Sequence, residues 1–466
     1  MRRSSLITPM LLSAMLVSVI LVSTILVTAV GCGEAAPPNV LLIVVDTLRV
    51  DHVGCYGHRR DTSPAIDRLA AEGVRFERAY ATAPWTKPSV ASMITGLYPS
   101  AHRANELESI AGESLLTLAE ILRDRGYATG GVVSAKLLTA RRGFAQGFEI
   151  YREGNARGVK HVSTPGVTRK ATDLLDRFSA GERPFFLFVH YFDPHYAYTG
   201  HSEIGFAAAG GGRLSGDESI GELRSMLADL SEDELGFLRD RYDEEIRFTD
   251  GGIEQLLSHA RKLGLESNTL IVLTSDHGEE FRERGWLGHT RSLYDELLRV
   301  PWIFRLPGLS AGGRSLSEPV SLVSLTPTVL ELLGIDPEGF GFQGRSLAQP
   351  ILGEADPEPA VIFAEVDYRP GDRELPIKLT HKKAVIVDRY KLIRDDETGS
   401  VEVYDLEDDP AEREDLSATR PQLVERLLSV LRSTLEHTAK GAVEGGVRKL
   451  SEEEVEQLRS LGYLDS

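Results

Sequence analysis

Three runs of largely apolar residues constrain what this 466-residue chain can fold into. They cover residues 40–45, 184–190 and 269–274. Apolar runs of this length, without an alternating polar position, are typical of strands that are buried on both faces of a sheet. Amphipathic helical patterns, such as those at residues 115–125 and 242–260, alternate with the predicted strands. The sequence therefore predicts an α/β fold with a large mixed sheet flanked by helices.

The composition changes near residue 355, where an acidic, proline-bearing stretch begins. Beyond it the sequence predicts short strands and two helices, the second of which starts with a capping box at Ser451. We therefore expect a large domain over residues 38–355 and a smaller α+β domain over residues 356–466. Residues 198–236 are rich in glycine, serine and charge, and we expect them to run over the surface.

Residues 1–32 resemble a bacterial lipoprotein signal peptide. Two arginines precede residues 6–30, which carry no charge, and Cys32 follows small residues. Cleavage before Cys32 and lipidation of that cysteine would leave residues 33–37 as a tether. An uncleaved membrane anchor is the alternative, because about 20 apolar residues suffice to span a bilayer. In either case we expect the globular part to be exported to the periplasm or cell surface and attached to the membrane.

Charge and cysteine content exclude two further classes of protein. The formal net charge of −18 argues against nucleic-acid binding, which needs a basic surface. The chain has two cysteines, and Cys55 has no partner if Cys32 carries lipid. We therefore expect a fold that disulfides do not stabilise.

Thr86 stands at the start of a short predicted helix that ends at Thr95, because Gly96 is a residue type that terminates helices. Unpaired N–H groups and the positive end of the helix dipole surround the N-terminus of a helix, and tetrahedral oxyanions bind well there. Taken alone, Thr86 is as well explained as an ordinary threonine N-cap.

Acidic groups and histidines follow the three predicted strands. Asp46 follows residues 40–45, and Asp276 and His277 follow residues 269–274. Each alone has a structural explanation, as a helix cap or a hydrogen-bonded histidine. Together, two aspartates and a histidine at one edge of a sheet are suited to a divalent metal, and a metal beside a hydroxyl lowers the pKa of that hydroxyl. His190, at the end of the second run, could be a ligand of a second metal, but we favour a core histidine.

Several motifs, in order along the chain, resemble the sulfatase family of the alkaline-phosphatase-like superfamily. They lie at residues 38–46, 88–89, 95–99, 193–195, 275–278, 287–289, 404–406 and 409–410, and the closing residues 458–464 resemble the tail of many bacterial members. The resemblance implies the sulfatase fold, with residues 38–355 as the catalytic domain and residues 356–466 as the α+β subdomain.

The resemblance also implies roles for individual residues. Asp46, Asp276 and His277 fall on metal-ligand positions, and Thr86 falls on the nucleophile, which also ligates the metal. His195 and His289 fall near groups that stabilise the transferred oxyanion and protonate the leaving group. The expected cofactor is one divalent metal ion: Ca, Mg, Mn or Zn.

The chain departs from the family pattern at the nucleophile. Sulfatases of the usual kind oxidise Cys or Ser to formylglycine, with an arginine four positions later, whereas this chain has Thr86 and Val90. Threonine carries a methyl group on Cβ and cannot form the aldehyde hydrate, so we expect no formylglycine. Thr47 stands where many members supply another acidic ligand. Relatives with a threonine nucleophile cleave or transfer phosphodiesters, phosphonates and phospholipid head groups.

The sequence thus predicts a metal-dependent hydrolase of sulfate or phosphate (diester or phosphonate) esters, acting through Thr86. Its expected substrate is a sulfated or phosphorylated small molecule or glycan. Two alternatives remain open: an envelope phospho-group transferase, and a catalytically degenerate, glycan-binding homologue. Lys87 is expected either to hold the equatorial oxygens of the transferred group or to lie in solvent.

Overall fold

The computed structural model describes residues 37–154, 162–207, 211–308, 312–356, 358–368 and 379–464. The predicted signal peptide over residues 1–32, with Cys32, and residues 33–36 of the tether lie outside the described residues. Residues 38–466 form one compact unit. None of the helices described is both long and apolar enough to cross a membrane.

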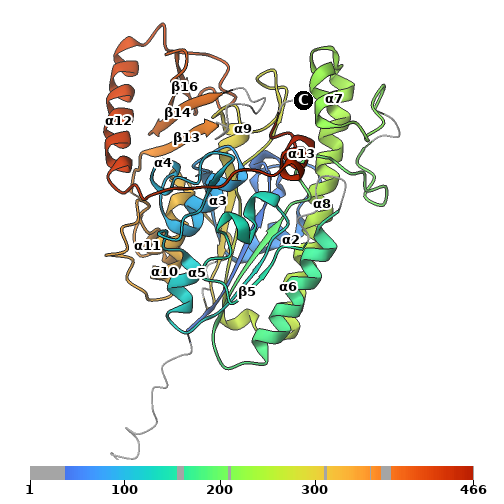
Figure 1. The fold of residues 1–466 in the computed structure, drawn as a ribbon, viewed down its shortest axis with the longest axis vertical. Helices are drawn as coiled ribbons and strands as arrows, with labels where there is room; N and C mark the ends of the chain where they lie inside the picture. Colours follow the sequence, from blue (N-terminus) through green and yellow to red (C-terminus); the bar gives the residue numbers. More distant parts are fainter. Residues whose placement is uncertain are drawn as a thin grey trace, which may run out of the picture. The chain divides into compact units, whose positions relative to one another are not determined.

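A large mixed sheet lies at the centre of this unit (Figure 1). Within the described residues its strands run in the order β11-β2-β10-β7-β1-β6-β4-β5, and β12 pairs with β2. The three predicted apolar strands are adjacent and parallel, and β10 runs antiparallel to β7, which confirms the predicted mixed sheet. The strands are β1 (Asn39–Val45), β2 (Val74–Tyr80), β4 (Ala128–Val132), β5 (Ile150–Arg152), β6 (Phe185–Tyr191), β7 (Thr269–Ser275), β10 (Arg299–Arg305), β11 (Arg314–Leu316) and β12 (Val320–Ser321).

Helices cover both faces of the sheet (Figure 1). Alternate residues of β1 show the division: Leu41 and Ile43 join one apolar cluster, and Leu42 and Val44 join the other. This explains why residues 40–45 of β1 are all apolar. The first face carries α2 (Pro64–Glu72), α6 (Thr164–Ser179) and α8 (Glu232–Lys262), and the second carries α3 (Thr86–Thr95), α5 (Leu118–Arg123), α10 (Leu325–Leu332) and α11 (Ala348–Leu352).

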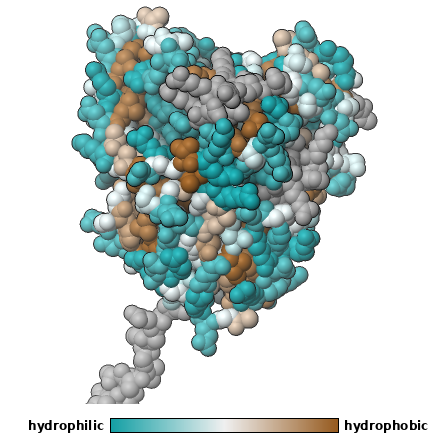
Figure 2. Space-filling model, viewed as in Figure 1, coloured by the Kyte–Doolittle hydropathy of each residue, from teal (hydrophilic) through white to brown (hydrophobic). Residues whose placement is uncertain are grey.

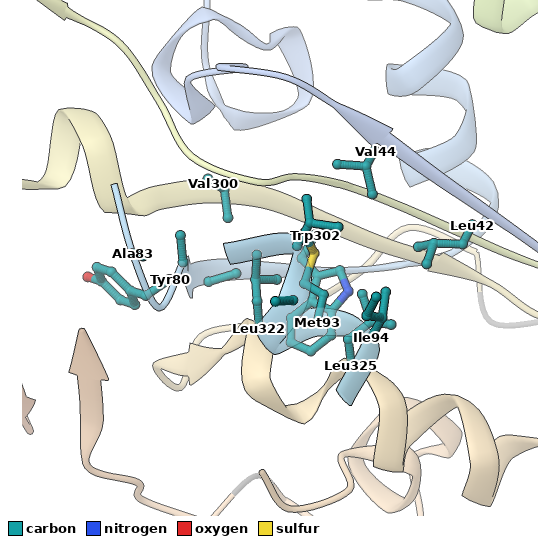
Figure 3. Close-up of a cluster of buried hydrophobic side chains, with 14 of the residues drawn as sticks. Leu42, Val44, Tyr80, Ala83, Met93, Ile94, Val300, Trp302, Leu322 and Leu325 are labelled. Atoms are coloured by element: carbon teal, nitrogen blue, oxygen red, sulfur yellow. The ribbon is translucent and has the colours of Figure 1, made fainter. Parts of the chain in front are cut away.

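The second apolar cluster fixes the position of α3 against the sheet. Figure 3 shows Met93 and Ile94 of α3 among Leu42 of β1, Trp302 of β10 and Leu325 of α10. These five side chains are at most 7% exposed. Burial of each such side chain stabilises the fold by about 1.5–3 kcal/mol, so the helix has little freedom to shift.

The excursion predicted over residues 198–236 is only partly irregular. It contains α7 (Ile220–Met226), and α8 starts at Glu232, ten residues before the predicted helix start. The Ser231 side chain accepts a hydrogen bond from the Glu234 N–H in a capping box, a signal that the sequence carried. The shorter helices and strands are α4 (Pro99–His102), α9 (Asp295–Leu298), β3 (Ser109–Ile110), β8 (Glu280–Phe281) and β9 (Leu287–Gly288).

A second, antiparallel sheet with α12 (Pro421–Ala439) packed on it follows the large sheet along the chain. The predicted boundary between residues 355 and 356 stays a prediction. The strands of this sheet, in spatial order, are β13 (Ile362–Tyr368), β14 (Thr380–Val387), β15 (Tyr390–Asp395) and β16 (Val401–Asp405).

The chain after α12 returns to the larger sheet's side of the molecule. β17 (Gly446–Val447) pairs with β3, and the segment then crosses to α13 (Glu452–Ser460), beside α7 (Figure 1). The capping box predicted at Ser451 is present. The face drawn in Figure 2 is largely hydrophilic, with hydrophobic residues in small patches.

Candidate active site

The carboxyl ends of β1, β6 and β7 bring three side chains to one point. In the parallel register, Val45 of β1 lies opposite Ser275 of β7, so Asp46 and Asp276 follow at the same edge. On the other side of β1, Val44 pairs with His190 of β6. Ligand atoms of Asp46, His190 and Asp276 lie within 4.8 Å of one another.

These ligand atoms are buried and lack hydrogen-bond partners. Both carboxylate oxygens of Asp46, Oδ2 of Asp276 and both ring nitrogens of His190 have no partner among the described residues. His277 Nε2 lies 3.5 Å from Asp46 Oδ1 and 3.7 Å from Asp276 Oδ2. Burial, followed by the negative charge of Asp276, raises the pKa of Asp46 well above its ordinary value.

Such a cluster fits a divalent cation. Leaving several polar atoms unpaired in the interior costs free energy, and a cation among them would offset that cost. Carboxylate oxygens and imidazole nitrogens are ligands that Mg²⁺, Ca²⁺, Mn²⁺ and Zn²⁺ accept in differing proportions. Thr47 Oγ1 is also buried without a partner beside this group, and the Thr47 N–H donates to Asp276 Oδ1 at 3.2 Å.

Thr86 is the first residue of α3, at the helix N-terminus as predicted, and the N-cap residue is Trp85 and not Thr86. Its Oγ1 lies 3.4 Å from His277 Nε2. Ser89, one turn further on, donates from Oγ to the Asp276 carbonyl oxygen at 2.6 Å, which fastens the N-terminus of α3 to the end of β7. The helix therefore presents a buried hydroxyl to the metal-ligand candidates.

The position of Lys87 contradicts both expectations, that it would hold the transferred group or lie in solvent. The side chain is fully buried, and Nζ donates to the carbonyl oxygens of Glu106, Leu107 and Ser109. Burial lowers the pKa of the Lys87 ammonium well below its ordinary value. Because its donors are taken by these carbonyls, Lys87 stabilises the loop after α4 and does not face the group that Thr86 meets.

His195 and His289 line the same buried site. Their ring centroids are 4.9 Å apart, and the His289 ring lies 4.5 Å from that of His277. Burial, with a smaller contribution from the neighbouring His289, lowers the pKa of His195 to about 3, and burial also lowers the pKa of His289 well below its ordinary value. Both imidazoles are therefore neutral at physiological pH.

Backbone and carboxylate acceptors fix the tautomers of the two histidines. His195 Nδ1 lies 2.8 Å from the Tyr196 carbonyl oxygen, and His289 Nδ1 lies 2.9 Å from Glu279 Oε1. Since these oxygens accept, each Nδ1 carries the hydrogen and each Nε2 keeps its lone pair. Two neutral bases thus face the site.

A tyrosine from the C-terminal tail completes the site. The Tyr463 hydroxyl lies 3.2 Å from Thr86 Oγ1 and 3.5 Å from His195 Nε2. Its ring is 4% exposed and packs against Trp85, His195 and His289.

Comparison with known proteins identifies the family. The family model described as Sulfatase matches residues 38–335, which is more than half of the chain. The chain belongs to the sulfatase family. A second model, N-sulphoglucosamine sulphohydrolase, C-terminal, matches residues 282–440 of this sulfatase-family chain. It is therefore a sulfatase-family ester hydrolase, and the exact class of ester is open.

Curated relatives of this sulfatase-family protein span its length. An uncharacterised sulfatase, YidJ of Escherichia coli strain K12, is 24% identical over 427 residues, which cover 81% of this chain and 83% of that protein. An N-acetylglucosamine-6-O-sulfatase of Bacteroides thetaiotaomicron is 22% identical over 463 residues, covering 81% and 82%.

Solved structures share the fold. The phosphonate monoester hydrolase of Agrobacterium radiobacter aligns with a TM-score of 0.68 and 20% identity over 90% of this chain and 99% of its own. A structure solved with its substrate D-glucosamine-2-N,6-O-disulfate aligns with a TM-score of 0.70 and 20% identity. The alignment covers 87% of this chain and 98% of the other.

The structure brings together all six residues predicted for the site: Asp46, Thr86, His195, Asp276, His277 and His289. Their roles stay predictions. His190, interpreted as a core histidine, lies among the metal-ligand candidates instead. Its place at the end of the strand paired with β1 was the available signal. Glu279 and Tyr463 were missed: Glu279 follows the predicted ligands by two residues, whereas nothing local to Tyr463 points to Thr86.

Proposed function

We propose that this protein hydrolyses sulfate or phosphate esters, including diesters and phosphonates, with Thr86 as the nucleophile and one divalent metal ion as cofactor. The observation that carries the proposal is the position of Thr86 Oγ1 at the start of α3, 3.4 Å from His277 Nε2 and beside the carboxylates of Asp46 and Asp276. Both oxygens of Asp46 and Oδ2 of Asp276 have no hydrogen-bond partner among the described residues. Asp46, Asp276, His277 and Thr86 would hold the cation, with His190 as a further ligand.

A bound divalent cation would lower the pKa of a ligated hydroxyl and offset negative charge on the transferred group. The residues of the chain supply the rest. The N-terminus of α3 presents N–H groups and the positive end of its dipole to an oxyanion. The neutral imidazoles of His195 and His289 are suited to accept a proton and return it.

Two displacements account for turnover. In the first, a bond forms between Thr86 Oγ and the sulfur or phosphorus, and the bond to the leaving oxygen breaks. The hydroxyl proton goes to a neutral imidazole, and His195 or His289 protonates the leaving oxygen. In the second, water attacks the same sulfur or phosphorus, the bond to Thr86 Oγ breaks, and one water proton restores the Thr86 hydroxyl.

Formylglycine has no part in this proposal. The Cβ of Thr86 bears a methyl group, so oxidation at that carbon would give a ketone and no aldehyde hydrate. Val90 stands where formylglycine enzymes have arginine, and it is fully buried among apolar side chains. Direct attack by a hydroxyl is the chemistry left to this chain.

Sulfated and phosphorylated glycans or small molecules are the proposed substrates. The named activities of the relatives support both sulfate and phosphorus esters as substrates, since they include an N-acetylglucosamine-6-O-sulfatase and a phosphonate monoester hydrolase. Transfer of a phospho group to an envelope acceptor is a second candidate, since a threonine ester could pass its group to an alcohol in place of water.

The test is a panel of 4-nitrophenyl sulfate, 4-nitrophenyl phosphate, bis(4-nitrophenyl) phosphate and 4-nitrophenyl phenylphosphonate with Mg²⁺, Ca²⁺, Mn²⁺ and Zn²⁺. We expect Thr86→Ala to lose at least about a hundredfold in kcat, with Thr86→Ser retaining activity. Thr95→Ala is the matched control, because Thr95 lies at the other end of the same helix. Its Oγ1 donates to the Ala91 carbonyl oxygen and accepts from the Leu97 N–H. Undiminished turnover by Thr86→Ala would remove Thr86 from its role.

We also propose attachment of the exported protein to the membrane through lipid on Cys32. Replacing Cys32 with serine should release the protein from the membrane fraction into the soluble one. Retention of Cys32→Ser in the membrane would favour the uncleaved N-terminal anchor.

A further inference from the structure

The segment that follows α13 places a hydroxyl against the proposed nucleophile. Gly462 adopts a positive φ of 77°, which turns the chain at the end of α13 and brings Tyr463 inward. The Tyr463 hydroxyl then lies 3.2 Å from Thr86 Oγ1 and 3.5 Å from His195 Nε2. These contacts join residues 377 and 268 positions apart in the sequence.

The direction of these hydrogen bonds follows from the acceptors. His195 Nδ1 points to the Tyr196 carbonyl oxygen, so Nε2 has a lone pair and accepts the Tyr463 hydrogen. The Tyr463 oxygen then has lone pairs to accept the hydrogen of Thr86. His277 Nδ1 likewise points to the Gly278 carbonyl oxygen, which leaves its Nε2 lone pair for a cation.

We propose that Tyr463 is a positioning residue of the active site. Its hydroxyl links Thr86 to His195 in one chain of hydrogen bonds and so fixes the direction in which the lone pairs of Thr86 Oγ1 point. This inference rests on the proposed function of Thr86. The hydrogen of a threonine hydroxyl rotates about the Cβ–Oγ bond, and a fixed acceptor for that hydrogen reduces this freedom before the substrate arrives.

The tail holds Tyr463 firmly enough for this role. Arg224 Nη1 donates to the Gly462 carbonyl oxygen at 2.9 Å, and the Tyr368 hydroxyl donates to the carbonyl oxygen of Tyr463 itself. Leu458 and Leu461 are buried in the same apolar cluster as α3. Because release of the tail would expose these side chains, Tyr463 belongs to the folded site and is not a lid that leaves at each turnover.

The test is Tyr463→Phe, which keeps the ring and removes the hydroxyl. With 4-nitrophenyl sulfate and bis(4-nitrophenyl) phosphate we expect kcat to fall about three- to tenfold, the effect of one hydrogen bond, with KM unchanged. The single-turnover rate of Thr86 ester formation, followed by rapid quench and intact mass, should fall by the same factor. Orthovanadate, which mimics the five-coordinate transition state, should bind three- to tenfold more weakly.

Tyr127→Phe is the matched control. Tyr127 is a buried tyrosine whose hydroxyl donates to the Pro38 carbonyl oxygen at 3.1 Å, outside the site. The Tyr127→Phe variant should lose a comparable hydrogen bond but show no change in kcat or in vanadate affinity. A fall in kcat shared by both variants would mark a general structural effect and overturn the proposal.

The outcomes separate this inference from the proposed function. Wild-type kcat and vanadate affinity in Tyr463→Phe, with Thr86→Ala inactive, would overturn the positioning role and leave Thr86 as nucleophile. A faster Tyr463→Phe would also overturn it, because the tyrosine would then obstruct the site. Full activity of Thr86→Ala would overturn both proposals.

Discussion

Asp46 and Asp276 place two carboxylates in an interior where neither is exposed. Two buried like charges repel each other and lose their hydration, so an unpaired pair is unfavourable. Three imidazoles lie nearby, from His190, His277 and His289. Carboxylates and imidazoles together form ligand sets for divalent metals. A divalent cation is the partner that suits this arrangement.

Asp276→Asn should therefore weaken metal binding by at least about tenfold, since losing even a residue that orients a ligand costs that much. Elemental analysis of the dialysed protein measures the bound metal directly. Asp250→Asn is the control: Asp250 is equally buried, but its carboxylate accepts the N–H groups of Ala65 and Ile66 at the start of α2. Full metal content in Asp276→Asn would contradict the assignment.

Sequence reasoning at this scale succeeded where a residue ends a recognisable strand or opens a helix. Asp46, Asp276 and Thr86 have such positions. The environment of the Lys87 Nζ could not be predicted in this way. Whether Nζ meets solvent or three carbonyl oxygens depends on how the loop after α4 folds back over it. For His190 the sequence left two alternatives open, because the register of β6 beside β1 is set by strand pairing and not by local composition.

Helix α3 is the element on which the site depends, and Gly96 fixes where it ends. Gly96 adopts a φ of 67°, and its N–H donates to the Ser92 carbonyl oxygen at 2.9 Å. A Cβ at this position would come within 2.6 Å of the Phe342 ring. The predicted C-terminus of α3 is thus confirmed, and the packing behind it adds a second reason for glycine.

Gly96→Ala should destabilise the protein by about 1–3 kcal/mol, since it combines a left-handed backbone with a steric clash. Gly264→Ala is the control, because Gly264 has a φ of 72° with nothing near its Cβ position. Denaturant unfolding measures the free energy of unfolding of both variants. The difference between their losses of stability is the contribution of the clash with Phe342. Equal losses of stability would mean that the Phe342 ring moves aside without cost and does not constrain α3.

Elements with continuous apolar runs were predictable, and elements that depend on distant partners were not. β1, β6 and β7 are apolar because both faces are covered, and that pattern is visible in the sequence. The first turn of α8 is acidic and follows a stretch rich in glycine, serine and charge, so the sequence analysis did not place the helix start at Glu232 despite its capping box. The fold class followed from the strand and helix alternation, whereas the return of the tail to α3 had no local signature.

Over the whole molecule, buried carboxyl groups make stability depend on pH. Burial raises the pKa of Glu245 and Glu280 to about 8 and that of Asp250 to about 7, above their values in the unfolded chain. The folded state then binds more protons than the unfolded state up to about pH 8, so stability falls as pH rises through this range. His102 and His195, whose pKa values are lowered to about 3, oppose this fall only below about pH 6.5. The lowered pKa of Lys87 opposes it at higher pH.

The melting temperature should therefore fall between pH 6.5 and 8.5, by about 1 °C for each kcal/mol of stability lost in a unit of this size. Calorimetry at fixed ionic strength and metal concentration measures it. Glu280→Gln keeps an oxygen for the N–H groups of Arg284 and Trp286 that now donate to Glu280 Oε1, and it should make the fall shallower. An unchanged slope in this variant would show that Glu280 does not titrate in that range.

Because Tyr463 lies near the end of the chain, the active site is completed late in synthesis. A ribosome makes this tyrosine 377 residues after Thr86, so the large sheet and α3 can be complete while the nucleophile still lacks its partner. A nascent chain, or one clipped by a protease before α13, would carry every metal ligand and remain a slow enzyme. Full catalytic competence would then arrive only with synthesis of the tail, whose Leu458 and Leu461 also complete the apolar cluster around α3.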